Sequence, residues 1–186
     1  MITIRQERPS DQSPREVLLD RAYGAIRFRK PSQKIRAGRL PAEGLSFVAT
    51  HRGRIIGTVR LWNVSAGGKA ALLLGPLAVH PDYRSRGIGA GLMSHAIESA
   101  QRLGHGAIIL IGDEPYYCRF GFSAAATGDL RVPGPFEQRR LLGLELVTNA
   151  LEGARGMIAG NGSRIPATDP RHTPSASPAR KRPRAA

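Results

Sequence analysis

The chain has 186 residues, of which 41% are hydrophobic, and it carries a formal net charge of +14. This length suits one domain with its own core, and the composition is not that of a fully disordered chain. The single cysteine, Cys118, excludes an internal disulfide, and the longest apolar runs are about half of the roughly 20 residues that a bilayer requires. The first ten residues lack the apolar core of a signal peptide, so we expect a cytoplasmic protein.

The positive charge is unevenly distributed. Residues 1–54 hold 12 Lys and Arg against 5 Asp and Glu, residues 55–159 hold 10 against 8, and residues 160–186 hold 6 against 1. The last segment is rich in Pro, Ser, Ala and Arg and poor in large apolar side chains. We therefore predict one domain over 1–159 and a disordered basic tail over 160–186. Nucleic acid is expected only as a non-specific contact of this tail, and a solvated tail without a partner is the alternative.

Hydrophobic periodicity predicts an α/β or α+β domain. The second expected element is a helix with Ser13 as its N-cap and Pro14 at its first position. In chain order the expected elements are an edge strand at 1–5, helices at 13–24 and 32–39, a hairpin at 45–64, a buried strand at 69–80, a helix at 87–103, a buried strand at 106–112, a short helix or turn at 114–120, a short strand at 121–125 and a last strand at 141–147.

The stretch LAVHPDYRSRGIGAGLM (77–93) joins the buried strand at 69–80 to the helix at 87–103 through a glycine-rich loop. The first N–H groups of a helix have no intrahelical partner, and together with the helix dipole they form an anion site that favours phosphate. The dinucleotide pattern G-x-G-x-x-G fails because Leu92 occupies its third glycine position, and the triphosphate loop G-x-x-x-x-G-K-[ST] is absent. What remains is R-x-x-G-x-G, formed by Arg84, Gly87 and Gly89.

This pattern resembles the coenzyme A pyrophosphate loop of the GCN5-related N-acetyltransferase (GNAT) superfamily. About 30 residues later, YYCRFGF (116–122) resembles a second motif of that superfamily. The resemblance covers about residues 2–148 in element order and is sharpest over 74–123. It implies a mixed, mostly antiparallel sheet of six or seven strands, flanked by about four helices, in which two central parallel strands splay apart.

The resemblance also implies a reaction, in which an amine attacks acetyl-CoA directly and coenzyme A leaves as a thiolate. Tyr117 aligns with the tyrosine that protonates the leaving sulfur and contacts the cofactor. A backbone amide near Leu77 or Ala78 polarises the thioester carbonyl. The residues implied in cofactor binding are Leu77, Ala78 and Val79, along the pantetheine, and Arg84, Ser85, Arg86, Gly87, Ile88, Gly89 and Ala90, around the pyrophosphate.

Several roles stay open at the level of sequence. Asp113 and Glu114 are either a turn and helix cap or a source of the general base, and Tyr116 is expected to pack in the core. No metal is expected, because one cysteine and five scattered histidines have no ligand spacing. A non-catalytic acetyl-CoA-binding module is the alternative function, and the oligomeric state is monomer or homodimer.

The acceptor is not specified by the sequence. The segment that shapes the acceptor site in this superfamily corresponds here to residues 21–44. It is made strongly basic by Arg21, Arg27, Arg29, Lys30, Lys34, Arg36 and Arg39. Such a segment attracts an acidic acceptor, helps to hold the 3′-phosphate of coenzyme A, or is a solvated basic surface. A highly cationic acceptor, such as a polyamine, fits it less well.

Overall fold

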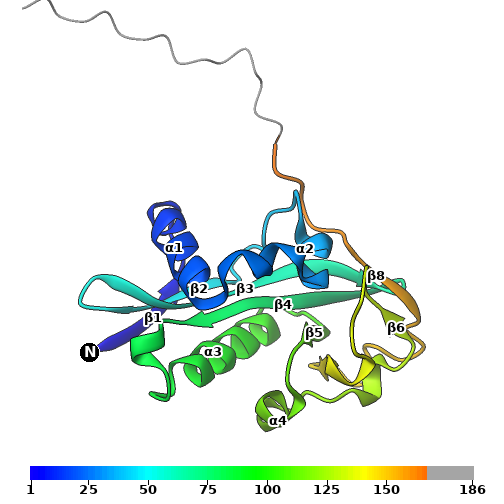
Figure 1. Ribbon diagram of the computed structural model, residues 1–186. Helices are drawn as coiled ribbons and strands as arrows, with labels where there is room; N and C mark the ends of the chain where they lie inside the picture. The colour runs from blue at the N-terminus through cyan, green and yellow to red at the C-terminus, as the bar shows by residue number, and fades with distance from the viewer. Residues whose placement is uncertain (167–186) are drawn as a thin grey trace, which may run out of the picture.

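The structure is a computed structural model that describes residues 1–166 (Figure 1). An eight-stranded sheet runs through the domain in the order β1-β2-β3-β4-β5-β7, and β8 pairs with both β3 and β6. The strands are β1 (Ile2–Gln6), β2 (Ser46–His51), β3 (Arg54–Ala66), β4 (Lys69–Val79), β5 (Ala107–Ile111), β6 (Leu130–Arg131), β7 (Leu141–Glu145) and β8 (Gly156–Gly160). The helices are α1 (Gln12–Tyr23), α2 (Pro31–Arg36), α3 (Ile88–Arg102) and α4 (Glu114–Tyr117).

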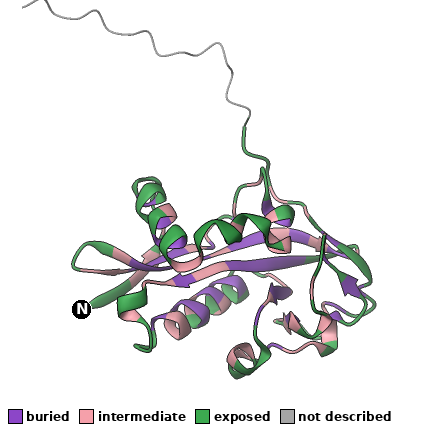
Figure 2. Cartoon of the chain, viewed as in Figure 1, coloured by how far each residue is buried: buried purple, intermediate pink, exposed green. Residues whose placement is uncertain are grey.

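The helices cover the sheet on two sides. Figure 1 shows α1 and α2 over one face and α3 and α4 below the other. Side chains alternate along the central strands, so Leu72 packs in the cluster that contains Leu92 and Met93 of α3. Leu73 packs in the opposite cluster with Trp62. The central strands are therefore buried on both faces, as the continuous apolar runs in the sequence predict (Figure 2).

The mixed fold class is confirmed, with eight strands rather than six or seven. Most neighbouring strands are antiparallel, and β4 and β5 form the central parallel pair. The additional strands are β6 and β8, which carry no clear apolar alternation. The strand expected over 121–125 is wrong, because that segment contributes only an isolated bridge between Ser123 and Gly143.

The first helix begins at Gln12, so Ser13 is not its N-cap and Pro14 is its third residue. Asp11 occupies the N-cap position, but its carboxylate is used elsewhere. It accepts hydrogen bonds from Arg5 Nη1 at 2.6 Å and from the backbone N–H of Arg8 at 2.7 Å. The Arg5 guanidinium is the main cause that lowers the pKa of Asp11 to about 2.

The predicted tail begins too early. Backbone hydrogen bonds continue past residue 160, from Leu40 N to Ser163 O at 2.8 Å and from Ile165 N to Gly38 O at 3.0 Å. The pairing occurs because the chain leaves β8 alongside the loop that follows α2. The remainder of the predicted tail, residues 167–186, lies outside the described residues.

A β-bulge interrupts β4 at its centre. Leu61 of β3 faces Leu74, whereas Val59 faces Leu77, so Gly75 and Pro76 together oppose one residue of β3. The Gly75–Pro76 peptide is cis, and Gly75 has a φ of 131°, which favours glycine. The buried indole Nε1 of Trp62 donates to the Gly75 carbonyl at 2.6 Å. Trp62 therefore fixes the backbone of the bulge.

Substituting Trp62→Phe removes this donor and leaves the buried Gly75 carbonyl without a partner. We expect the free energy of unfolding to fall by about 1–3 kcal/mol. Urea denaturation followed by circular dichroism measures this change, with an unchanged denaturant slope as the control for two-state unfolding. A variant as stable as the parent would contradict this role of Trp62.

Candidate active site

The loop between β4 and α3 presents unpaired backbone donors. Ser85 and Gly87 have positive φ values of 59° and 73°, and Gly87 is the N-cap of α3 without a side-chain cap. The first backbone bond of the helix runs from Gly91 N to Gly87 O at 2.9 Å. The N–H groups of residues 88–90 therefore have no intrahelical acceptor, which makes this 15-residue helix a site for an anion.

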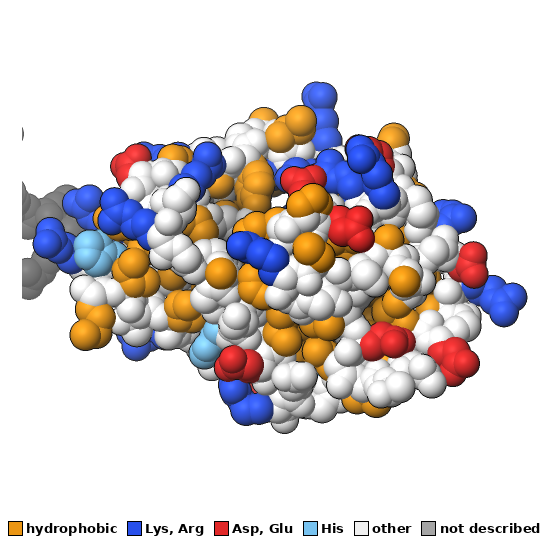
Figure 3. Space-filling view, turned by 90° about the horizontal axis from the view of Figure 1, so that it is seen from below, with side chains coloured by type: hydrophobic (Ala, Val, Ile, Leu, Met, Phe, Trp, Pro, Cys, Tyr) orange, Lys and Arg blue, Asp and Glu red, His pale blue; other side chains and the backbone are white. Residues whose placement is uncertain are grey.

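Two arginines add positive charge to this loop. Arg84 and Arg86 are exposed, and neither forms an ion pair within residues 1–166. The Arg86 guanidinium lies 5.3 Å from the ring centroid of Tyr83. On the face that carries α3 and α4, basic side chains are interspersed with acidic and apolar ones (Figure 3). The positive charge at this loop therefore comes from Arg84 and Arg86 and not from a basic face around them.

The parallel strands β4 and β5 separate immediately after their first contacts. Their register contains only Leu72 with Ile108 and Leu73 with Ile109. Beyond the bulge at Gly75–Pro76, β4 pairs with β3 on one side only. The structure thus contains the gap between central strands that the resemblance implies.

The edge of β4 that faces the gap has identifiable polar groups. His80 N donates to Ile56 O at 2.8 Å, so antiparallel alternation directs the peptide groups of Ala78 toward β3. The peptide groups of Leu77 and Val79 then face the gap. Consistent with this, the Tyr23 hydroxyl donates to the Leu77 carbonyl. Of the three residues expected along the pantetheine, two direct their backbone groups toward the gap and Ala78 does not.

A cavity of about 70 Å³ lies where β4 and β5 separate. Tyr117 and Tyr23 line it together with the bulge, and no Asp, Glu or His among the described residues does so. Its charged lining residues, Arg27, Lys30 and Arg36, are all basic, and Ser32 adds a neutral hydroxyl. The full lining is Tyr23, Arg27, Lys30, Ser32, Arg36, Leu74, Gly75, Pro76, Leu77, Leu110, Ile111 and Tyr117.

The phenol of Tyr117 is held in this cavity by close packing. A side chain on Gly112 would collide with the Tyr117 ring, so the chain approaches the phenol there without a Cβ. The rings of Phe122 and Tyr117 are 6.1 Å apart in an edge-to-face arrangement. Burial, followed by the nearby Tyr23 and Tyr116, raises the pKa of Tyr117 well above its usual range. Tyr117 therefore retains its proton at neutral pH.

Tyr116 is partly buried against the core, as expected, but it also reaches the loop. A Cβ built on Gly89 would lie 2.9 Å from the Tyr116 hydroxyl. Gly89 therefore allows α4 to approach the start of α3, and the sequence motif gave no sign of this contact. A glycine at position 89 is therefore required for the packing of α4 against α3, independently of any ligand.

The remaining polar side chains near the loop and α4 lie outside the cavity. Asp113 pairs with Arg140 at 3.1 Å, and Glu114 and Cys118 are exposed. His80 lies 2.7 Å from Arg21 Nη1 through Nε2, and its Nδ1 accepts from Asp82 N at 3.3 Å. Within residues 1–166, no group of three or more His, Cys, Asp or Glu could hold a metal ion, and no helix is long and apolar enough to cross a membrane.

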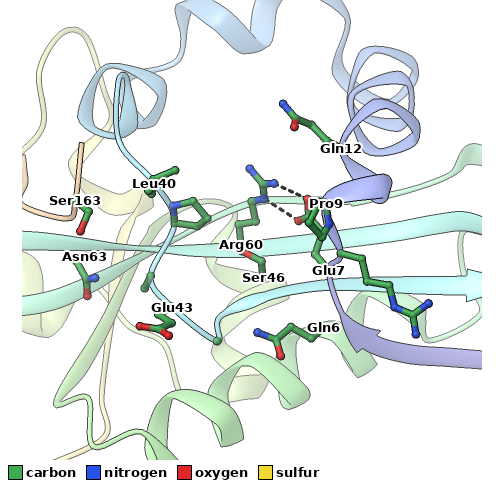
Figure 4. A pocket seen from close by; sticks show the side chains of 14 residues that line it. Gln6, Glu7, Pro9, Gln12, Leu40, Glu43, Ser46, Arg60, Asn63 and Ser163 are labelled. Atoms are coloured by element: carbon green, nitrogen blue, oxygen red, sulfur yellow. Dashed lines mark hydrogen bonds and ion pairs between the residues drawn. The ribbon is translucent and has the colours of Figure 1, made fainter. Parts of the chain in front are cut away.

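A larger cavity of about 630 Å³ lies elsewhere, between the start of the chain and the loop after α2 (Figure 4). Two of its charged side chains, Glu7 and Arg60, pair with each other. Glu7 accepts hydrogen bonds from Arg60 Nε at 2.8 Å and from Arg15 Nε at 3.1 Å. This cavity holds neither the loop nor the tyrosines, so its size does not make it the reactive centre.

Comparison with known proteins gives the family. The sequence pattern of the acetyltransferase (GNAT) domain matches residues 42–124, which include both the loop and Tyr117. The chain is 32% identical over 158 residues to the N-acetyltransferase YhbS of Escherichia coli K12, covering 83% of this chain and 93% of that protein. This chain belongs to the GNAT family of acetyltransferases.

Solved GNAT structures agree with this assignment. The crystal structure of Escherichia coli YhbS in complex with CoA matches with a TM-score of 0.73 and 31% identity, over 86% of this chain and 89% of that one. A GNAT family acetyltransferase from Brucella melitensis in complex with acetyl-CoA matches with a TM-score of 0.66 and 25% identity, over 87% and 96% of the two chains. The GNAT resemblance stated from the two sequence motifs is thereby confirmed.

Two residues that line the cavity were not predicted as site residues from the sequence. Tyr23, at the end of α1, and Arg36, at the end of α2, both line the cavity beside Tyr117. Arg36 belonged to the basic segment noted in the sequence, but composition cannot tell which of its arginines is buried. Tyr23 gave no signal, because a single tyrosine at a helix end is common in any fold.

The contact between Gly89 and Tyr116 predicts coupled stability effects. Gly89→Ala should destabilise the parent, because the new methyl group meets the Tyr116 hydroxyl, whereas it should be neutral or stabilising in a Tyr116→Phe background. A double-mutant cycle by urea denaturation should give a coupling of about 1 kcal/mol. Additive effects would show that the two residues are not in contact.

Proposed function

We propose that this chain transfers an acetyl group from acetyl-CoA to a primary amine by direct attack of the amine on the thioester. The observation that carries the proposal is the continuity of the site. Unpaired N–H groups at the start of α3, an open edge of β4 and a cavity lined by Tyr117 follow one another along a single gap in the sheet. The CoA and acetyl-CoA complexes of two similar GNAT proteins support the same choice of co-substrate.

The loop would hold the pyrophosphate of acetyl-CoA. The N–H groups of residues 88–90 supply hydrogen bonds to phosphate oxygens, and Arg84 and Arg86 add charge-assisted contacts. Their lack of acidic partners within residues 1–166 supports this role. The outward-facing groups of Val79 would pair with the pantetheine as an added strand, and the N–H of Leu77 lies further along the same edge.

The reaction then needs a donor for the oxyanion and a proton for the sulfur. The amine nitrogen forms a bond to the carbonyl carbon, and the backbone N–H of Leu77 stabilises the negative oxygen. When the intermediate collapses, the carbon–sulfur bond breaks and Tyr117 gives its proton to the leaving thiolate. The phenol is protonated at neutral pH, as a proton donor must be.

The cavity also influences the protonation of the amine. Lys30 and Arg36 place positive charge beside the position of the nucleophile, which disfavours the ammonium form and favours the neutral, reactive amine. This electrostatic effect reduces the need for a carboxylate base, and the lining holds none. The proton of the attacking nitrogen leaves to water.

Gly89→Asp should abolish acetyl-CoA binding, because it places a carboxylate among the N–H groups that would hold the pyrophosphate. Calorimetric titration of acetyl-CoA into the parent and the variant measures the effect. Gly89→Asn is the matched control, because its side chain meets the Tyr116 hydroxyl in the same way but carries no negative charge. Equal acetyl-CoA affinity in parent and Gly89→Asp would remove the loop from the site.

Tyr117→Phe should lower kcat by about a hundredfold or more and leave acetyl-CoA affinity almost unchanged, as loss of a general acid does. Thiol release with an accepted amine gives kcat, and calorimetry gives the affinity. Tyr116→Phe is the neighbouring control, because Tyr116 does not line the cavity. A Tyr117→Phe enzyme with full turnover would exclude the acid role. Acetyl-CoA binding without thiol release for any amine would instead indicate the non-catalytic alternative.

A further inference from the structure

The proposed reaction does not explain why Arg36 is buried without an ion-pair partner among the described residues. Its side chain lines the cavity beside Tyr117, although the residue is only 8% exposed. Its one side-chain hydrogen bond runs from Nε to Gln33 Oε1 at 2.9 Å, and it forms no ion pair within residues 1–166. Its Nη1 lies 3.9 Å from the position of a Cβ on Gly75, at the bulge.

Two other arginines of this region, the buried Arg15 and the half-buried Arg27, form ion pairs with carboxylates. Arg15, which is 5% exposed, pairs with Glu7 at 3.1 Å and with Glu16 at 2.7 Å. Arg27, the neighbour of Arg36 in the cavity lining, pairs with Glu16 at 2.6 Å and with Asp20 at 2.9 Å. The carboxylates nearby are thus already used, and Arg36 is the exception.

A buried guanidinium without a counter-charge is costly. Burial, and then repulsion by Arg27, lowers the pKa of Arg36 to about 10. Folding alone does not require this charge, because the aliphatic part of the side chain could be replaced by an unbranched apolar residue. A group that is costly in the free protein and faces the reactive cavity is expected where a ligand supplies the missing negative charge.

The shape of Arg36 indicates which anion it binds. A guanidinium presents a planar fork of donors that matches a carboxylate in a bidentate manner. The Gln33 bond holds Nε, and the guanidinium lies 6.0 Å from the Trp62 ring centroid, so its orientation is limited. The fork is therefore positioned before any ligand arrives.

The small volume of the cavity beside Tyr117 limits the distance between the bound anion and the reacting nitrogen of the acceptor. The cavity that Arg36 and Tyr117 share measures about 70 Å³, little more than twice the roughly 30 Å³ of a water molecule in the liquid. A second cavity of about 450 Å³ adjoins it, because Lys30, Ser32 and Ile111 line both. The second cavity has room for the remainder of an acceptor, and its lining includes the apolar Pro135 and Phe136.

We propose that the acceptor is an amino acid, or another small amine with a carboxylate within a few bonds of its nitrogen, and that Arg36 binds this carboxylate. The proposal rests on the acetyltransferase function above. The carboxylate occupies the cavity beside Tyr117, and the side chain of the acceptor extends into the larger cavity. Cationic acceptors without an acidic group are disfavoured by Lys30 and Arg36 together.

The test is thiol release from acetyl-CoA with each of the twenty amino acids beside its α-amide and its decarboxylated amine. We expect at least one free amino acid to exceed both analogues by about a hundredfold or more in kcat/KM. Arg36→Met should remove this preference, because it slows the acid far more than it slows the two analogues. Arg36→Lys, which keeps the charge and loses the fork, should recover part of it.

Arg29→Met is the matched control, because it removes one exposed positive charge from the same segment. It should leave the preference for the carboxylate intact. A readout without turnover comes from thermal unfolding. Arg36→Met should be more heat-stable than the parent by a few degrees, and the preferred amino acid should raise the Tm of the parent but not that of Arg36→Met.

The outcomes separate this inference from the function on which it rests. Amides or decarboxylated amines that react as well as the acids would overturn it, and so would a preference for O-phosphoethanolamine over every carboxylate. An unchanged acid preference in Arg36→Met would overturn the role of Arg36. In each of these cases acetyl-CoA-dependent thiol release continues, whereas loss of acetyl-CoA binding or turnover in the parent would overturn the acetyltransferase function itself.

Discussion

The separation of β4 from β5 is the constraint on which the rest of this structure depends. Two parallel strands that were paired throughout would leave no free polar edge at the centre of a sheet buried on both faces. The bulge at Gly75–Pro76 ends that pairing after Leu73, and Trp62 holds it through the Gly75 carbonyl. The free backbone groups of Leu77 and Val79 are tolerated there because the gap is open to ligands and, at Leu77, because Tyr23 donates to the carbonyl.

The same gap brings together segments that are far apart in the chain. The loop after β4 supplies unpaired helix N–H groups, the turn after β5 supplies Tyr117, and the ends of α1 and α2 supply Tyr23 and Arg36. Tight approaches make these meetings possible, since Gly112 admits the ring of Tyr117 and Gly89 admits the hydroxyl of Tyr116. The glycines of the motif therefore serve packing between α3 and α4 as well as access to the backbone.

The sequence was informative where a local pattern has one physical meaning. The continuous apolar runs of β4 and β5 predicted strands buried on both faces, and the glycine-rich turn before α3 predicted a helix start with free donors. It was uninformative where a role depends on distant partners. Nothing local distinguishes Arg36 from Arg27 or Arg15, because only the fold decides which arginine receives Glu7, Glu16 or Asp20. Short strands such as β6, which depend on β8 for pairing, were missed for the same reason.

Comparing these arginines separates residues that stabilise the fold from one that serves a ligand. Arg15 and Arg60 share the carboxylate of Glu7, so their charges are compensated within the chain. Arg36 is buried without such compensation, and it lies on the side of the sheet from which α1 and α2 reach the gap. An uncompensated charge beside a phenol that keeps its proton forms an environment that is complete only when an anion enters with the nucleophile. The unpaired charge of Arg36 is therefore the feature of the fold that selects the acceptor.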